Sequence, residues 1–176
     1  MSIAIFAAGC FWGIEKKFDL TKGVTKVEVG YTGGETKNPT YEQVCYEETG
    51  HAEAVRINFD ENIITYKELL NVFWSCHNPT TLNRQGPDIG KQYRSAIFYL
   101  NDKQRLEAEK SKKIMNETMF DKNIVTEITK FDEFYLAEDY HQNYYNDNTN
   151  QGYCRYVIGP KLEKFEKVFK DKLKND

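Results

Sequence analysis

The chain has 176 residues, of which 29% are charged and 40% hydrophobic, and its formal net charge at pH 7 is −3. This length predicts a single domain over residues 1–176 that buries about two thirds of its unfolded surface. The net negative charge offers no basic surface to nucleic acid or to an anionic membrane, and the apolar start of the chain is too short to span a bilayer and lacks a basic leader. We therefore expect a cytoplasmic monomer with no nucleic-acid or membrane partner.

The first half of the chain shows the periodicity of alternating strands and helices. In chain order we expect a strand at residues 3–8, a helix at 11–20, strands at 24–30 and 52–59, and a helix at 65–76. Apolar side chains recur every second residue in the strands and every three to four residues in the helices. Thr65 and Glu68 form a capping-box pair, which is typical of a helix start.

The second half continues with a loop at residues 80–91, a strand at 93–100, a helix at 102–119, a strand at 124–129 and a final helix at 162–173. Between the last two lies the asparagine-rich stretch 138–154, which has no sustained period and reads as a long, functional or mobile surface loop. We expect an α+β domain with a mixed, mostly antiparallel sheet and a long irregular C-terminal loop.

The cysteines and histidines are scattered along the chain. They are Cys10, Cys45, Cys76, Cys154, His51, His77 and His141. No cysteine pair has the two-residue spacing of a zinc site or a thioredoxin-like motif, so we expect neither a metal nor a bound cofactor. In a reducing compartment, any disulfide is expected to be transient and catalytic.

Cys10 stands where the first strand gives way to the first helix. Unpaired N–H groups and the helix dipole at a helix N-terminus favour a thiolate, which makes a nucleophile of a cysteine placed there. The flanking Gly9 and Gly13 would leave room for a substrate. The alternative is that Cys10, Phe11 and Trp12 are ordinary core residues.

Glu53 lies on the apolar face of its predicted strand, together with Val55, Ile57 and Phe59. Apolar surroundings would raise the pKa of this carboxyl and leave an acid able to donate a proton near neutral pH. The alternative is that Glu53 reaches water at the strand end or pairs with an arginine.

Asp88 and Tyr93 bracket a glycine-containing loop. Taken singly, Asp88 is typical of a turn, and Tyr93 and Tyr41 are typical of a core or an interface. The chain holds 12 tyrosines, which allow an aromatic pocket with hydroxyl donors but do not establish one.

Six motifs lie in one order along nearly the whole chain. They are "GCFWG" (9–13), "GYTGG" (30–34), "NPTYEQVC" (38–45), "TGHAEAV" (49–55), "RQGPDIGKQYRS" (84–95) and "AEDYHQNY" (137–144). Together they closely resemble the peptide methionine sulfoxide reductases of the A type. The resemblance implies a two-layer α/β sandwich around a mixed sheet, thioredoxin as the reductant, and reduction of methionine S-sulfoxide in proteins and peptides and as the free amino acid.

The resemblance also implies a role for each matching residue. Cys10 is the nucleophile, Glu53 is the acid, Phe11 and Trp12 form the pocket for the substrate methyl group, and Tyr41, Asp88 and Tyr93 hold the sulfoxide oxygen and the polar end of the substrate. A sulfoxide sulfur is a poor electrophile until its oxygen is protonated, so an acid has to face the thiolate. Methionine then leaves, and Cys10 remains as a sulfenic acid.

Two positions depart from the family pattern. Many relatives carry two recycling cysteines in a glycine-rich tail, whereas this chain has Cys154 alone, so we expect a Cys10–Cys154 disulfide that thioredoxin, or dithiothreitol in vitro, reduces. Asn78 stands where relatives commonly have aspartate, which puts a charged role there in doubt. Cys45 and Cys76 lie in helix-like segments and are expected to be structural.

Two other classes of function remain open from the sequence. Cys10, Glu53 and His51 could form an acyl-transfer triad, which would need no Cys154. A redox sensor or a methionine-peptide binding module would bind without turnover.

Overall fold

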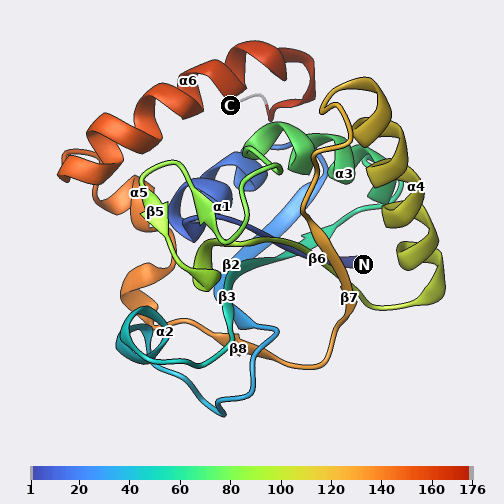
Figure 1. The fold of residues 1–176 in the computed structure, drawn as a ribbon. Helices are drawn as coiled ribbons and strands as arrows, with labels where there is room; N and C mark the ends of the chain where they lie inside the picture. The colour runs from blue at the N-terminus through green and yellow to red at the C-terminus, as the bar shows by residue number, and fades with distance from the viewer. Residues whose placement is uncertain (1, 175–176) are drawn as a thin grey trace.

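The computed structural model describes residues 2–174, and its centre is a six-stranded sheet in the order β7-β6-β1-β3-β2-β8 (Figure 1). The strands are β1 (Ser2–Ala8), β2 (Val24–Thr32), β3 (Ala52–Phe59), β6 (Ser95–Tyr99), β7 (Glu127–Lys130) and β8 (Phe134–Leu136). β6 and β7 pair in parallel and the other neighbours are antiparallel. The prediction of an α+β fold with a mixed, mostly antiparallel sheet is therefore confirmed.

The helices gather mainly on one face of this sheet (Figure 1). They are α1 (Phe11–Asp19), α2 (Tyr41–Tyr46), α3 (Tyr66–Cys76), α4 (Asp102–Thr118), α5 (Tyr144–Asp147) and α6 (Gly159–Val168). α6 lies over α1 in Figure 1, so the C-terminal part of the chain covers the helix that begins beside Cys10. No helix within residues 2–174 combines the length and the apolar character needed to cross a bilayer.

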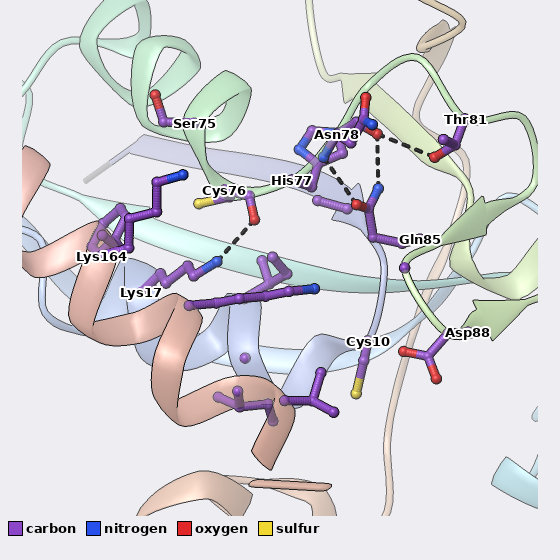
Figure 2. A pocket seen from close by; sticks show the side chains of 18 of the residues that line it. Cys10, Lys17, Ser75, Cys76, His77, Asn78, Thr81, Gln85, Asp88 and Lys164 are labelled. Atoms are coloured by element: carbon purple, nitrogen blue, oxygen red, sulfur yellow. Dashed lines mark hydrogen bonds between the residues drawn. The ribbon is translucent and has the colours of Figure 1, made fainter. Parts of the chain in front are cut away.

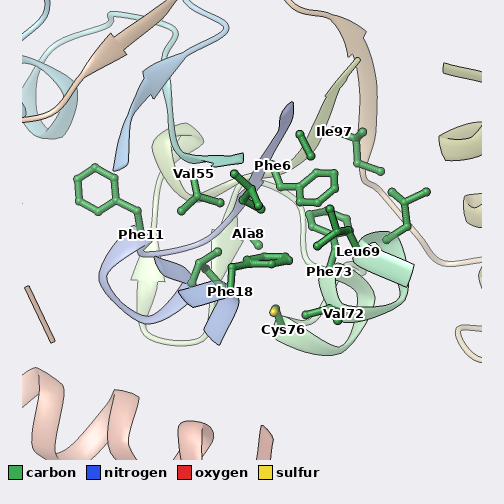
Figure 3. Packing of buried hydrophobic residues seen from close by; sticks show 14 of the residues in the cluster. Phe6, Ala8, Phe11, Phe18, Val55, Leu69, Val72, Phe73, Cys76 and Ile97 are labelled. Carbon is green, nitrogen blue, oxygen red and sulfur yellow. The ribbon is translucent and has the colours of Figure 1, made fainter. Parts of the chain in front are cut away.

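The main hydrophobic core fills the space between the sheet and these helices (Figure 3). Phe6 of β1 packs against Phe18 of α1 and Phe73 of α3, with ring centroids 5.7 Å and 4.9 Å apart. The opposite face of β1 carries a smaller cluster that includes Ile5 and Phe98. Burial of such a side chain contributes about 1.5–3 kcal/mol, so the larger cluster fixes α1, and with it Cys10, against the sheet.

Several segments differ from the sequence-based expectation. The loop at 80–91 holds a small hairpin of β4 (Arg84–Gln85) and β5 (Asp88–Ile89), and Tyr93 ends a 3₁₀ helix (Lys91–Tyr93) rather than beginning β6. The expectation of a long irregular loop at 138–154 is wrong in part. That stretch contains a 3₁₀ helix (Asp139–His141) and α5, and the chain is helical again before Cys154.

Candidate active site

Cys10 is the N-cap residue of α1 and follows Gly9 at the end of β1. Gly9 has φ of +92°, and a Cβ atom at this position would lie 2.8 Å from Cγ of Gln85. Both the backbone angle and the lack of space therefore favour glycine here. The tight turn leaves the Cys10 side chain partly exposed at the start of the helix.

Glu53 lies opposite Cys10 at the same helix end. Its Oε1 accepts a hydrogen bond from the backbone N–H of Phe11 at 3.1 Å, and its side chain is 1% exposed. Burial raises the pKa of Glu53 to about 8, the Phe11 amide lowers it and the charge of Asp88 raises it. The carboxyl is therefore largely protonated at neutral pH, and its partner is a backbone amide rather than water or an arginine.

The pKa of the Cys10 thiol lies well above its usual value. Burial is the largest cause, the charges of Glu53 and Asp88 add to it, and hydrogen bonds with the Trp12 amide and with the Tyr153 hydroxyl oppose it. The expectation that the helix N-terminus would produce a resting thiolate is thus wrong. Loss of water and two nearby carboxyls outweigh the helix dipole, so the resting pair is a thiol and a carboxylic acid.

Two tyrosines lie close to the Glu53 carboxyl. Burial and then the charge of Glu53 raise the pKa of both Tyr41 and Tyr93. The two hydroxyls therefore stay neutral and able to donate hydrogen bonds. The backbone N–H of Tyr41 donates to Oε2 of Glu138 at 2.9 Å, which ties α2 to the segment after β8.

Asp88 meets a residue that the sequence analysis did not identify, Tyr153. The Tyr153 hydroxyl donates a hydrogen bond to Oδ2 of Asp88 and also forms a hydrogen bond with Cys10. Tyr153 thus joins the β4–β5 hairpin to the nucleophile. Its position next to Cys154 was the one sequence signal that could have pointed to it.

Trp12 forms one wall of the site within an aromatic cluster. Its ring stacks on Tyr144 with centroids 3.8 Å apart and planes at 12°, and its Nε1–H donates to Nδ1 of His141 at 2.9 Å. Phe11 is 1% exposed and packs in the core against the rings of Tyr31 and His141. Trp12 is therefore the more accessible of the two predicted pocket residues.

His141 and Glu138 support the site, although no role had been assigned to them. His141 is fully buried, and its Nε2 has no hydrogen-bond partner among the described residues. Glu138 accepts from the Tyr31 hydroxyl at 2.9 Å. Both residues belong to the "AEDYHQNY" motif, which was the signal that could have identified them.

Cys154 is 0% exposed and begins a π-helical turn (Cys154–Ile158) that runs into α6. Its backbone N–H donates to Oε1 of Gln151 at 3.0 Å. The charges of both Cys10 and Cys154 act on Tyr144, which therefore lies near both sulfurs. The expectation that Cys154 sits in a mobile loop is wrong, because the aromatic and helical packing of residues 144–158 buries it.

The other cysteines and His51 have local partners. Cys45 hydrogen-bonds with Tyr41, and Cys76 is buried at the end of α3. Nδ1 of His51 accepts from the Gly34 N–H at 3.0 Å and Nε2 lies 2.6 Å from the Thr36 carbonyl oxygen. Both ring nitrogens of His51 hold this loop, so the ring is not available as a base for Cys10.

Asn78 caps the turn after α3. Its Oδ1 accepts from the backbone N–H and the hydroxyl of Thr80 at 3.0 Å and 2.6 Å. Its own N–H donates to Gln85 at 2.9 Å. The side-chain contacts use only the acceptor oxygen of Asn78, which an aspartate would also provide, so they assign no charged role to this position.

Comparison with known proteins identifies the family. The family model "Peptide methionine sulfoxide reductase" matches residues 2–173. Peptide methionine sulfoxide reductase MsrA of Acinetobacter baumannii (strain AYE) is 52% identical over 175 residues, which cover 99% of this chain and 100% of the relative.

Solved structures agree with this match. Methionine sulfoxide reductase A of Corynebacterium diphtheriae is 36% identical, with a TM-score of 0.82 over 88% of this chain and 77% of its own. Mxr1 of Saccharomyces cerevisiae in reduced form is 34% identical, with a TM-score of 0.81 over 87% of this chain and 88% of its own. Mxr1 in complex with Trx2 matches with a TM-score of 0.57 and 25% identity over 81% of this chain and 84% of its own. With the Cys10–Glu53 arrangement, these matches show that the chain belongs to the peptide methionine sulfoxide reductase family.

Proposed function

We propose that this chain reduces methionine S-sulfoxide, in proteins and peptides and as the free amino acid, through attack by Cys10 with Glu53 as the proton donor. The observation that carries the proposal is the 3.1 Å bond from the Phe11 amide to Glu53. It fixes a carboxyl at the helix end that bears the nucleophile. A pKa of about 8 supplies that carboxyl with a proton at neutral pH.

The chemical step follows from this arrangement. Glu53 gives its proton to the sulfoxide oxygen, the sulfur–oxygen bond of the substrate breaks, and the proton of the Cys10 thiol returns to Glu53. The oxygen ends on Cys10 as a sulfenic acid and methionine leaves. Cys10 is oxidised by two electrons and the sulfoxide is reduced by two, so no other reductant enters this step.

Neighbouring residues hold the substrate in this proposal. Tyr41 and Tyr93 donate hydrogen bonds to the sulfoxide oxygen as neutral groups, which cost less to bury than charges. Trp12, with Phe11 behind it, receives the methyl group, and Asp88 contacts the polar end of the substrate. The stacking of Tyr144 on Trp12 sets the orientation of that wall.

Cys154 serves as the resolving thiol in the second half of the cycle. Its S–H condenses with the Cys10 sulfenic acid to give a disulfide and water, and thioredoxin reduces that disulfide by thiol exchange. The complex of yeast Mxr1 with Trx2 supports the choice of reductant. A disulfide that forms and is reduced in each cycle suits a cytoplasmic location.

A single-turnover experiment tests the proposal. The reduced enzyme is mixed with a methionine sulfoxide peptide, and released methionine peptide and Cys10 sulfenic acid, trapped with dimedone, are measured by mass spectrometry. We expect no release by Cys10→Ser, and release by Glu53→Gln slowed by about two to four powers of ten. An acyl-transfer enzyme or a binding module would release no methionine peptide. The absence of methionine peptide from the unmodified enzyme would therefore overturn the proposal.

A further inference from the structure

A cavity of about 880 Å³ extends from Cys10 between α1, α6 and the end of α3 (Figure 2). Cys10, Gly13, Ile14 and Lys17 line it and, at this spacing, form one face of α1. Figure 2 shows Cys10 and Asp88 at one end of the cavity and Lys17 and Cys76 at the other. The volume lies within the range of ligand sites, about 300–1,000 Å³.

Most of the charged side chains that line this cavity are basic. Lys17, Arg84, Lys161 and Lys164 line it, against the single carboxylate of Asp88 at the Cys10 end. None of these four cations forms an ion pair with a carboxylate of residues 2–174. The cavity therefore carries a positive charge that the described part of the chain does not neutralise.

Lys17 is the deepest of these cations. It is 5% exposed, and its Nζ donates to the Cys76 carbonyl oxygen at 2.8 Å. An ammonium group has three donors, and within residues 2–174 Lys17 uses one of them, in the bond to Cys76. Nζ also lies 5.9 Å from the centroid of the Phe165 ring, so an apolar wall stands beside the charge.

We infer that this cavity binds the polypeptide segment next to the substrate methionine sulfoxide and favours an aspartate or glutamate in that segment. The inference rests on the proposed function, because the sulfoxide has to reach Cys10, where the cavity begins. Its basic charge selects an acidic occupant, and its apolar wall accepts the stems of neighbouring side chains.

The length of the cavity predicts where the acidic residue lies. Cys10 and Lys17 are seven residues apart, which is about 10 Å along a helix at 1.5 Å per residue. An extended peptide covers the same length in about three residues. An acidic side chain about three positions from the methionine sulfoxide therefore comes level with Lys17.

Matched peptides test this inference. Four peptides carry aspartate or asparagine three positions before or after one methionine sulfoxide, and kcat/KM for methionine release is measured with each. We expect one aspartate peptide to exceed its asparagine partner by about three- to tenfold, through a lower KM. The preference should shrink in 1 M salt, where the screening length falls to about 3 Å.

Charge reversal on α6 supplies the matched variants. Lys161 is exposed and lines the cavity, whereas Lys167 is exposed on the same helix and is not among the lining residues. Lys161→Glu should remove the aspartate preference and Lys167→Glu should keep it, although both change the net charge equally. Arg84→Glu, on another wall of the cavity, should also remove the aspartate preference.

The outcomes separate the two levels of inference. Equal kcat/KM for the aspartate and asparagine peptides in the unmodified enzyme, or an equal preference in Lys161→Glu, Arg84→Glu and Lys167→Glu, would overturn the proposed cavity function. No methionine release from either asparagine peptide would instead overturn the proposed reductase mechanism.

Discussion

The buried carboxyl of Glu53 couples folding to pH, and replacement by glutamine should remove that coupling. The pKa of Glu53 is about 8 in the folded chain against an ordinary value of 4.5. Between these values the folded state holds a proton that the unfolded state has lost. The free energy of unfolding therefore falls as pH rises, by about 1.4 kcal/mol per pH unit for one proton.

The size of this change in the free energy of unfolding follows from the pH range over which Glu53 is protonated only in the folded state. From pH 5 to pH 8 the Glu53 contribution to the free energy of unfolding should fall by about 3 kcal/mol, allowing for partial ionisation near pH 8. Glutamine keeps an oxygen that can accept the Phe11 N–H but cannot ionise. Its unpaired N–H₂ costs about 1–3 kcal/mol, but that cost does not depend on pH. Relative to the unmodified chain, Glu53→Gln should thus gain about 3 kcal/mol between pH 5 and pH 8.

Urea unfolding, followed by tryptophan fluorescence in the presence of a reductant at pH 5, 6, 7 and 8, measures this gain. Glu15→Gln is the matched control, because Glu15 is also buried and burial raises its pKa to about 7. Glu15→Gln should also remove part of the fall in the free energy of unfolding with pH, but that part ends near pH 7 rather than near pH 8. If the curves of stability against pH for Glu53→Gln and the unmodified chain run parallel, the raised pKa of Glu53 is refuted.

Three further predictions concern activity. Single-turnover reduction should fall about tenfold per pH unit above pH 8 as Glu53 loses its proton, and a rapid-quench series in which Glu53→Gln shows the same decline would contradict this. Trp12→Ala should raise the Kd for a methionine sulfoxide peptide, measured by calorimetry on Cys10→Ser, by about tenfold through lost burial, and an unchanged Kd would remove Trp12 from the pocket. Cys154→Ser should release one equivalent of methionine and then accumulate dimedone-reactive Cys10 without thioredoxin-driven turnover; normal turnover would mean that another thiol resolves the sulfenic acid.

Elements with a strong local signal could be predicted from the sequence. β3 occupies the predicted residues 52–59, and the predicted capping box of α3 is present, with Oγ1 of Thr65 accepting from the Glu68 N–H at 3.1 Å. In both cases the information lies within a few residues, in side-chain alternation or in one cap. Pairing with distant parts of the chain was not needed to locate them.

Residues that support the site through distant contacts could not be found this way. The bond from Trp12 to His141 joins residues 129 apart, and the bond from Tyr153 to Asp88 joins residues 65 apart. Neither partner has a local pattern that distinguishes it from an ordinary core aromatic or a turn residue. These pairings depend on how α1, α5 and the β4–β5 hairpin pack, which is information about the whole fold.

The protonation state of Cys10 could not be predicted from the sequence for the same reason, because the larger energies that set it come from distant residues. The helix N-terminus is visible in the sequence, and its effect is about 0.3–1 kcal/mol at an exposed site. Burial and the charges of Glu53 and Asp88 act in the opposite direction, and both carboxyls reach Cys10 only through the fold. The local term therefore has the right sign for a thiolate but is too small to decide the outcome.

Cys154 shows how composition misleads when a segment is held by its partners. Asparagine and glycine disfavour helices, so residues 138–154 read as loop, yet stacking of Tyr144 on Trp12 and the π-helical turn bury the sulfur. π-Helical turns are rare in proteins, and those that do occur are often found at functional sites. Tyr144 lies near both sulfurs of the proposed Cys10–Cys154 disulfide, and an aromatic pair such as Tyr144 with Trp12 contributes only about 0.5–1.5 kcal/mol beyond burial. The stacking of Tyr144 on Trp12 is therefore weak enough to rearrange when the proposed disulfide forms, whereas the core packing of Ile158 and Leu162 keeps the following helix in place.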